Sequence, residues 1–234
     1  MRSFYRIIGK RCLDVFLSII GLLVTAPVFL IVSVAITLTS SGPVLFRQKR
    51  IGIHKKIFYI VKFRTMRKDA PKDIPTHMLQ YQEKYITKLG RFLRRTSLDE
   101  LPQLFNILKG DMAFVGPRPA LWNQDDLIAE RDKYGANDVL PGLTGWAQIN
   151  GRDELPISVK ARLDGEYVEK MSFRFDCKCF FGTIIPVFKQ KGVVDGTCEQ
   201  CEANQERSEE SGKQPEAGRE QPEECEEQAE SARE

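Results

Sequence analysis

The hydrophobic pattern begins with a long apolar segment near the N-terminus. Roughly 26 residues, from about Leu13 to Leu38, are nearly all apolar, whereas about 20 such residues span the hydrocarbon core of a bilayer. The segment therefore predicts a membrane-embedded helix. A cleavable signal peptide is the alternative, but its apolar region would be shorter, and a cleavage site of small residues would follow it.

Basic residues lie on both sides of this segment. Lys and Arg are normally retained on the cytoplasmic face of a membrane, so we expect both ends of the helix there. Pro27 lies near the middle and removes one helical hydrogen bond, which favours a kink at Ala26 and Pro27. The pattern predicts a re-entrant helix over residues 1–42, with a tilted spanning helix as the alternative. The flanking basic residues are Arg2, Arg6, Lys10 and Arg11 before the segment and Arg47, Lys49, Arg50, Lys55 and Lys56 after it.

The middle of the chain alternates strand-like and helix-like segments. β-Branched and aromatic residues within 44–66 predict short strands, and helical periodicity follows. The last periodic segment suits a helix that packs on the core or lies on the membrane surface. We therefore predict an α+β protein: a re-entrant N-terminal membrane helix and, over residues 43–196, a small, mainly helical cytoplasmic catalytic domain with short strands and interfacial helices. The expected helices cover residues 85–95, 98–109, about 123–135, 159–171 and 180–191.

Charge is distributed very unevenly along the chain. Residues 197–234 contain 13 Glu and no Asp against 4 Lys or Arg, a net charge of −9, and they contain no aromatic residue. Such a segment buries too little apolar surface to fold, so we expect a disordered acidic tail. Because the whole chain carries +3, the other 196 residues carry +12. This charge suits nucleic acid, anionic lipid or phosphorylated small molecules, and charge alone does not choose among them.

The six cysteines predict no disulfide framework. Three lie in the acidic tail and one lies in the apolar segment, so we interpret all six as free thiols in a reducing compartment. Cys198 and Cys201 have the spacing of zinc ligands. A second pair that would complete four ligands is missing, so we expect no zinc site there.

The segment Arg94–Gln103 combines two guanidinium groups with the adjacent carboxylates of Asp99 and Glu100. One interpretation is structural, because Ser97 and Glu100 have the spacing of a helix capping box. The other is chemical: Arg94 can bind phosphate, while paired carboxylates can hold Mg²⁺ or provide a nucleophile. The two interpretations are compatible.

Two further segments are candidates for ligand contact. In Gly116–Pro119 an arginine lies between two prolines, which hold it in a stiff turn suited to phosphate or a planar base. The segment Leu140–Arg152 is a loop punctuated by glycines with one tryptophan. An ordinary structural loop is an equally good interpretation of the second segment.

These blocks together resemble the bacterial sugar transferase family, the small monotopic phosphoglycosyl transferases that initiate polysaccharide and glycoprotein glycan assembly. The resemblance covers residues from about 8 to 195, and its motifs occur in the same order. Besides the basic, apolar N-terminus with its proline, they are Gly42–Gln48 (GPVLFRQ), Lys62–Met66 (KFRTM), Ser97–Gln103 (SLDELPQ), Gly116–Pro119 (GPRP) and Pro141–Gly145 (PGLTG).

The resemblance implies roles for individual residues. The family's catalytic dyad, which also holds Mg²⁺, falls on Asp99 and Glu100. Its helix break is a Ser-Pro pair, whereas this chain has Ala26-Pro27, so the hydroxyl that could support the kink is missing. The implied substrate-binding residues are Lys62, Arg64, Arg94, Pro117, Arg118 and Pro119.

The resemblance also implies an activity. The expected reaction moves a sugar-1-phosphate from a UDP-sugar to polyprenyl phosphate, such as undecaprenyl phosphate, through a covalent intermediate on Asp99 and with release of UMP. The expected location is the cytoplasmic face of the bacterial inner membrane, where the protein also contacts membrane lipid. This would be the first membrane step of exopolysaccharide, capsule, O-antigen or glycoprotein glycan synthesis.

A non-catalytic, basic membrane-bound protein of a polysaccharide-assembly complex is the competing interpretation. It explains the charge and the apolar helix but not the dyad and the rigid arginine. Nucleic acid is not an expected partner, because no binding motif accompanies the charge. The sugar, the glycan pathway, the formation of a homodimer and the role of the tail are not specified by the sequence.

Overall fold

The computed structural model describes residues 5–70, 84–151 and 155–189, which fall within one compact unit, Met1–Gly196. The predicted acidic tail, residues 197–234, lies outside the described residues. So do Cys198 and Cys201.

A long apolar helix opens the structure. After a π-helical turn at Tyr5–Gly9, α2 runs without interruption over Lys10–Thr39 and contains Pro27. In the described part of the chain it is the one helix whose length and composition would allow it to cross a membrane. The predicted apolar helix is confirmed, and its re-entrant course stays a prediction. Several of its apolar side chains have exposed fractions between 67% and 81%: Leu23, Val24, Leu30, Ile31 and Leu38.

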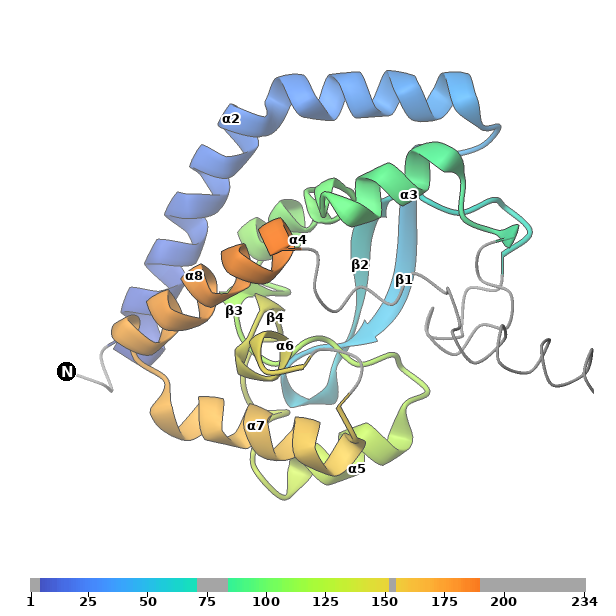
Figure 1. Ribbon diagram of the computed structural model, residues 1–234. Helices are drawn as coiled ribbons and strands as arrows, with labels where there is room; N and C mark the ends of the chain where they lie inside the picture. Colours follow the sequence, from blue (N-terminus) through green and yellow to red (C-terminus); the bar gives the residue numbers. More distant parts are fainter. Residues whose placement is uncertain (1–4, 71–83, 152–154, 190–234) are drawn as a thin grey trace, which may run out of the picture. The chain divides into compact units, whose positions relative to one another are not determined.

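Helix α2 is bent in its middle part, as Figure 1 shows. Pro27 lies inside the helix and cannot donate the backbone hydrogen bond of its position, which weakens the helix there. Ala26 has no hydroxyl, but the Thr25 hydroxyl donates to the Gly21 carbonyl at 2.6 Å, and back-bonding of this kind favours bending. The bend is thus present without the Ser of the family pattern.

Two small sheets follow. The short strands expected within residues 44–66 are present as β1 (Leu45–Ile51) and β2 (Ile57–Phe63), and they pair as an antiparallel hairpin. Strands β3 (Ala113–Val115) and β4 (Gly142–Thr144) pair in parallel. The second sheet was not predicted, because three-residue strands that lie far apart in sequence leave no periodic pattern.

The helices agree with the expected segments except at their ends. The expected helix at residues 98–109 is divided: a 3₁₀ turn, η5 (Leu98–Glu100), precedes α4 (Gln103–Lys109), and Pro102 lies just before α4. The short helix α6 (Trp146–Ile149) in the glycine-rich loop was not expected. The last helix begins earlier than predicted, at Phe173. The remaining helices are α3 (Lys88–Arg95), α5 (Asp125–Asp132), α6 (Trp146–Ile149), α7 (Ile157–Lys170) and α8 (Phe173–Lys189).

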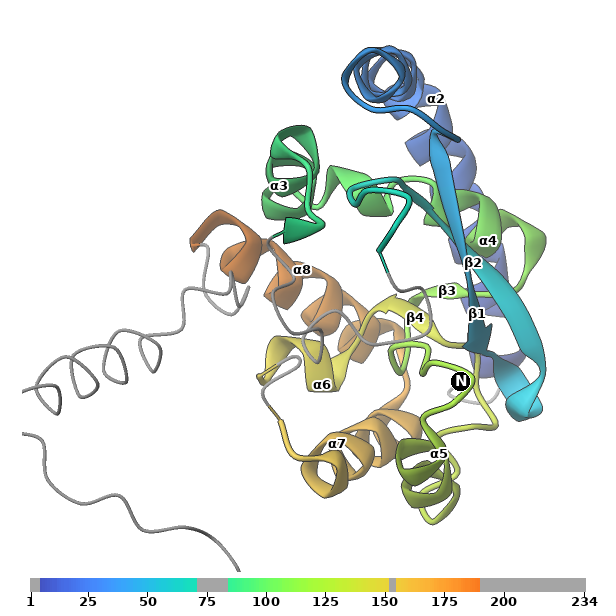
Figure 2. The same ribbon diagram turned by 90° about the vertical axis from the view of Figure 1, so that its right-hand side faces the viewer.

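The inner side of α2 is part of the hydrophobic core. Leu22 packs on a cluster around Leu104 and Phe58, and Val32 and Ile36 pack in a second cluster with the residues around Phe63. Figures 1 and 2 show α2 on one side of the β1–β2 hairpin, with α5 and α7 toward the other end of the molecule. Side chains of the membrane-type helix therefore contribute to two clusters of the hydrophobic core.

A buried polar cluster around Asp176 joins the start of α2 to α7 and α8. One carboxylate oxygen of Asp176 binds Lys10 Nζ at 2.6 Å and the Tyr5 hydroxyl at 2.7 Å. The other oxygen accepts a hydrogen bond from the Tyr167 hydroxyl at 2.9 Å. That hydroxyl also lies 3.0 Å from the Val115 carbonyl, so the cluster extends to β3.

A buried ion pair joins α5 to α7. Two nitrogens of Arg131 donate to Asp164 Oδ2 at 2.8 and 2.6 Å, and the two side chains are only 4% and 1% exposed. Burial raises the pKa of Asp164, while the Arg131 charge opposes this rise. Each charge therefore depends on the other, because burial leaves little access for water to solvate either group.

The Arg131–Asp164 pair gives a test of this packing. Removal of one partner should cost about 3–5 kcal/mol, because it leaves the other charge buried and alone. We expect Arg131→Met to lower the thermal unfolding temperature of the detergent-solubilised protein strongly. Lys133→Met, which removes a partner of the more exposed Glu130–Lys133 pair, should change it little. Equal effects of the two substitutions would show that burial does not make the Arg131–Asp164 pair important for stability.

Candidate active site

The predicted dyad lies in a tight turn between α3 and α4. Ser97 has left-handed backbone angles (φ 56°, ψ 16°), and its side chain makes no capping hydrogen bond. The predicted capping box at Ser97 and Glu100 is therefore wrong, since this backbone turns the serine away from the capping geometry. The Glu100 N–H instead donates to the Ser97 carbonyl at 3.2 Å. The turn places Asp99 and Glu100 next to β2.

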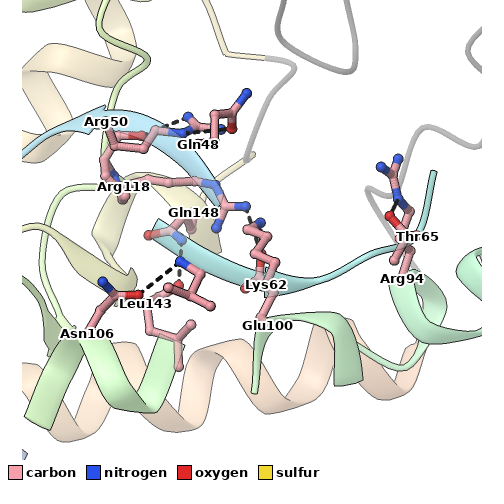
Figure 3. A network of polar contacts seen from close by, with 12 residues as sticks. Gln48, Arg50, Lys62, Thr65, Arg94, Glu100, Asn106, Arg118, Leu143 and Gln148 are labelled. Atoms are coloured by element: carbon pink, nitrogen blue, oxygen red, sulfur yellow. Dashed lines mark hydrogen bonds and ion pairs between the residues drawn. The ribbon is translucent and has the colours of Figure 1, made fainter. Parts of the chain in front are cut away.

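Glu100 joins three separate segments of the chain. Its Oε1 atom accepts from Lys62 Nζ on β2 at 2.8 Å and from the guanidinium of Arg118 at 2.9 Å. Figure 3 shows these three side chains meeting between the hairpin and the turn. Asp99 is 8% exposed and has no direct ion pair within the described residues. The structure thus brings together Lys62, Asp99, Glu100 and Arg118 as a compact charged site.

The two carboxylates have different protonation properties. Burial and the neighbouring Glu100 charge raise the pKa of Asp99 to about 6, although Lys62, Arg94 and Arg118 oppose this rise. Burial would also raise the pKa of Glu100, but the charges of Lys62 and Arg118 outweigh it and hold that pKa well below its usual range. Asp99 is therefore the more basic carboxylate, and the more basic carboxylate is the better nucleophile once ionised.

Arg94 lies at the border of this site. Its Nε atom donates to the Thr65 hydroxyl at 2.9 Å, and Figure 3 shows both side chains apart from the Glu100 ion pairs. Its charge nevertheless favours the ionised form of Asp99. The predicted phosphate contact of Arg94 stays a prediction.

Arg64 occupies a different environment from that of the other basic residues. It is 7% exposed, and its guanidinium donates to the carbonyls of Ser40 and Ser41 at 2.8 and 3.1 Å. Arg64 therefore binds the carbonyls at the C-terminal end of α2. The structure does not bring it into the Glu100 cluster, and its substrate contact stays a prediction.

Close backbone packing holds the Pro117–Pro119 loop. A Cβ atom added to Gly142 would lie 2.1 Å from Gly116 N. Neither Gly142, where β4 begins, nor Gly116, just after β3, therefore has room for a side chain. The Pro117 carbonyl accepts from Gly142 N–H at 2.8 Å, and the Pro119 carbonyl accepts from Arg50 at 3.0 Å. The glycine-rich segment, described over residues 140–151, thus packs against the Pro117–Pro119 loop, here called the arginine loop, and supports it. In the sequence Arg50 stands out only as a flanking charge, because its role depends on the fold.

The acidic groups fit a cation that is shared with a substrate. Within the described residues, no three or more His, Cys, Asp or Glu side chains gather as metal ligands. Mg²⁺, however, commonly uses only one or two carboxylates and takes its other ligands from water and substrate phosphates. Asp99 and Glu100 are the residues that would hold it.

Comparison with known proteins gives the family. The sequence profile described as bacterial sugar transferase matches residues 5–190. The uncharacterized sugar transferase EpsL of Bacillus subtilis is 40% identical over 184 residues, which are 79% of this chain and 89% of EpsL. The exopolysaccharide production protein PSS of Rhizobium leguminosarum bv. phaseoli is 38% identical over 188 residues, 75% of this chain and 93% of that protein.

A longer relative has a more specific name. The UDP-glucose:undecaprenyl-phosphate glucose-1-phosphate transferase of Escherichia coli K12 is 39% identical over 197 residues. These cover 79% of this chain but only 41% of the E. coli protein. The family predicted from the motifs and the prediction of a transferase enzyme are both confirmed. With the dyad, the arginine loop and the apolar helix all inside the matched region, the chain belongs to the bacterial sugar transferase family.

Proposed function

We propose that the chain transfers a sugar-1-phosphate from a UDP-sugar to undecaprenyl or a similar polyprenyl phosphate and releases UMP. The buried, basic Asp99 beside the Lys62–Glu100–Arg118 cluster carries this proposal. A diphosphate donor needs cations around its charge, and the transfer needs a group that attacks phosphorus. The names of several relatives support undecaprenyl phosphate as the acceptor. A non-catalytic protein would not need this arrangement.

Asp99 is the proposed nucleophile. A carboxylate oxygen of Asp99 forms a bond to the β-phosphorus of the UDP-sugar. The bond from that phosphorus to the bridging oxygen breaks, and the electron pair leaves with UMP. A phosphate oxygen of the polyprenyl phosphate then attacks the same phosphorus and releases Asp99. Two displacements replace one difficult step between two anions.

The basic residues are proposed to lower the charge repulsion in both displacements. Lys62 and Arg118 share one oxygen of Glu100 and their charges act on Asp99, which supports the proposal that they bind phosphate oxygens approaching Asp99. Bound Mg²⁺, held by Asp99 and Glu100, would supply further neutralisation of the diphosphate charge. Pro117 and Pro119 keep the Arg118 backbone stiff, which lowers the entropy lost when Arg118 binds substrate.

A re-entrant course of α2 is proposed for the membrane segment. Both ends of α2 bind the same compact unit: Lys10 binds Asp176 at 2.6 Å, and the Ser40 carbonyl accepts from Arg64 at 2.8 Å. A helix that crossed about 30 Å of hydrocarbon would leave its ends on opposite sides of the membrane. The bend near Pro27 and the flanking basic residues support the same course. The catalytic residues would then lie at the cytoplasmic face of the bacterial inner membrane.

The nucleophile can be tested by an isosteric substitution. Asp99→Asn keeps the shape of the side chain but removes the charge that attacks phosphorus, so UMP release should fall by at least about 1,000-fold. Glu100→Gln should also lose most activity. The assay measures UMP released from a panel of UDP-sugars with undecaprenyl phosphate and Mg²⁺. Asp126→Asn, at an exposed carboxylate on α5, is the matched control and should keep full activity. Substantial turnover by Asp99→Asn would exclude Asp99 as the nucleophile.

The raised pKa of Asp99 predicts an acid limb in the pH profile. Below its pKa of about 6, Asp99 is protonated and cannot attack, so kcat/KM should fall about tenfold per pH unit. Above that pH the carboxylate is ionised and kcat/KM should level off. Recovery of the rate on return to pH 7.5 controls for unfolding. A constant kcat/KM between pH 7 and pH 5 would contradict the assignment.

The course of α2 can be tested by labelling. In a variant without its native cysteines, single cysteines replacing Ser3 or Ser41 should react only from the cytoplasmic side. The measurement compares membrane-impermeant maleimide labelling of intact cells with that of inverted membrane vesicles. Labelling of either position from the periplasm would refute the re-entrant course.

A further inference from the structure

Asn106 occupies the free edge of the β1–β2 hairpin. It lies on α4 and is 4% exposed. Its Oδ1 atom accepts from the Val61 N–H at 3.0 Å, and its Nδ2 atom donates to the Tyr59 carbonyl at 2.8 Å. In an antiparallel pair, every second residue directs its backbone groups away from the partner strand. The Asn106 amide thus takes the place of a third strand beside β2.

The residue bound by Asn106 is adjacent to a residue of the active site. Val61 immediately precedes Lys62, whose Nζ atom binds Glu100 at 2.8 Å. Glu100 and Asn106 lie six positions apart on the segment formed by η5 and α4. This segment is therefore attached to β2 at two points, by Lys62–Glu100 and by Asn106–Val61, and the contacts close a ring. A closed ring restricts the motion of Lys62 relative to Asp99.

An amide is chemically suited to this position. It offers one donor group and one acceptor in the same plane, as a peptide group does, whereas a carboxylate offers no donor and an alkyl side chain offers neither. At 4% exposure, water has little access to replace a lost partner. The turn after α4 fixes Asn106 further, because the backbone carbonyl of Asn106 accepts from the N–H groups of Gly110 and Asp111 at 3.1 and 3.0 Å.

We propose that Asn106 is a positioning residue for the transfer reaction: by binding the edge of β2, it holds Lys62 against Glu100 and beside Asp99. The inference rests on the proposed function. Asn106 acts through Lys62, so its effect on catalysis depends on the Lys62 side chain.

Asn106→Ala should lower kcat more than it changes KM. Loss of the two hydrogen bonds to Val61 and Tyr59 frees the edge of β2 and allows Lys62 to move, and displacements of this kind cost a reaction about tenfold to 100-fold. The KM for the UDP-sugar should stay within about twofold, because the Arg118 loop rests on the β3–β4 pair. The assay measures UMP release by the full-length protein in detergent with undecaprenyl phosphate.

Asn137→Ala is the matched control. Asn137 is 6% exposed, and its amide donates to the Ile128 carbonyl and to Asp132 Oδ1, each at 2.8 Å. The control therefore removes an equally buried amide with two hydrogen bonds but leaves the ring intact. Its kcat should stay within about twofold of the wild-type value. If the two variants lost the same activity at comparable thermal stability, the inference would be overturned.

A double-mutant cycle tests whether Asn106 acts through Lys62. If it does, Lys62→Ala combined with Asn106→Ala should be no more than about threefold slower than Lys62→Ala alone. Losses that multiply would show independent roles and would overturn the inference. A general loss of stability would instead slow the wild type and Lys62→Ala by the same factor when Asn106→Ala is added. The cycle therefore separates positioning from such a loss.

Hydrogen exchange separates the inference from the proposed function. Amides of residues 57–63 should exchange at least about tenfold faster in Asn106→Ala than in the wild type, while Asn137→Ala should leave them unchanged. Unchanged protection in Asn106→Ala would overturn the inference whatever the activity. A wild-type protein that released UMP from no UDP-sugar would instead refute the proposed function, and exchange would still report whether Asn106 holds β2.

Discussion

The packing of the inner side of α2 against the globular part is the interaction on which the other elements depend. Leu22 and Ile36 belong to two different core clusters, so each half of the bent helix contributes to the core. Arg11 binds the last carbonyls of α4 at 2.6 and 2.8 Å, and the Asp14 carboxylate accepts from the Phe114 N–H of β3 at 3.0 Å. The helix that follows the dyad and the strand that precedes the Pro117–Pro119 loop are therefore both anchored to a helix with a membrane-type composition.

The charged site balances two opposing effects. Burial disfavours charge on Asp99 and Glu100, and three basic residues from different segments oppose burial. The balance differs between the two carboxylates because only Glu100 has direct ion pairs with Lys62 and Arg118. Adjacent residues in one turn thus have different chemistry. The ionised form is favoured at Glu100, while Asp99 is the more basic carboxylate, which fits the role of nucleophile proposed for it.

Much of the architecture could be predicted from local sequence. The apolar helix, the two strands of the hairpin and most helix positions follow from composition and periodicity, and the motifs identified the residues of the Glu100 cluster. The short β3–β4 pair could not be predicted, because two glycines that pack backbone on backbone have no periodic signature. The contacts between Asn106 and β2 were missed for a related reason: the two partner atoms on β2 belong to the backbone 45 and 47 positions away in sequence. The capping box failed because the left-handed backbone of Ser97 depends on tertiary packing.

The shared core of α2 has a consequence for where the enzyme can be active. A chain that failed to enter the bilayer would expose the outer apolar residues of α2 to water and would tend to aggregate. It could not simply detach this helix, since Leu22, Val32 and Ile36 also complete the core of the globular part. Under the proposed re-entrant course, insertion of α2 and folding of the globular part would therefore depend on each other. Under the proposed function, this coupling would confine use of the sugar donor to the membrane, where the polyprenyl phosphate acceptor is present.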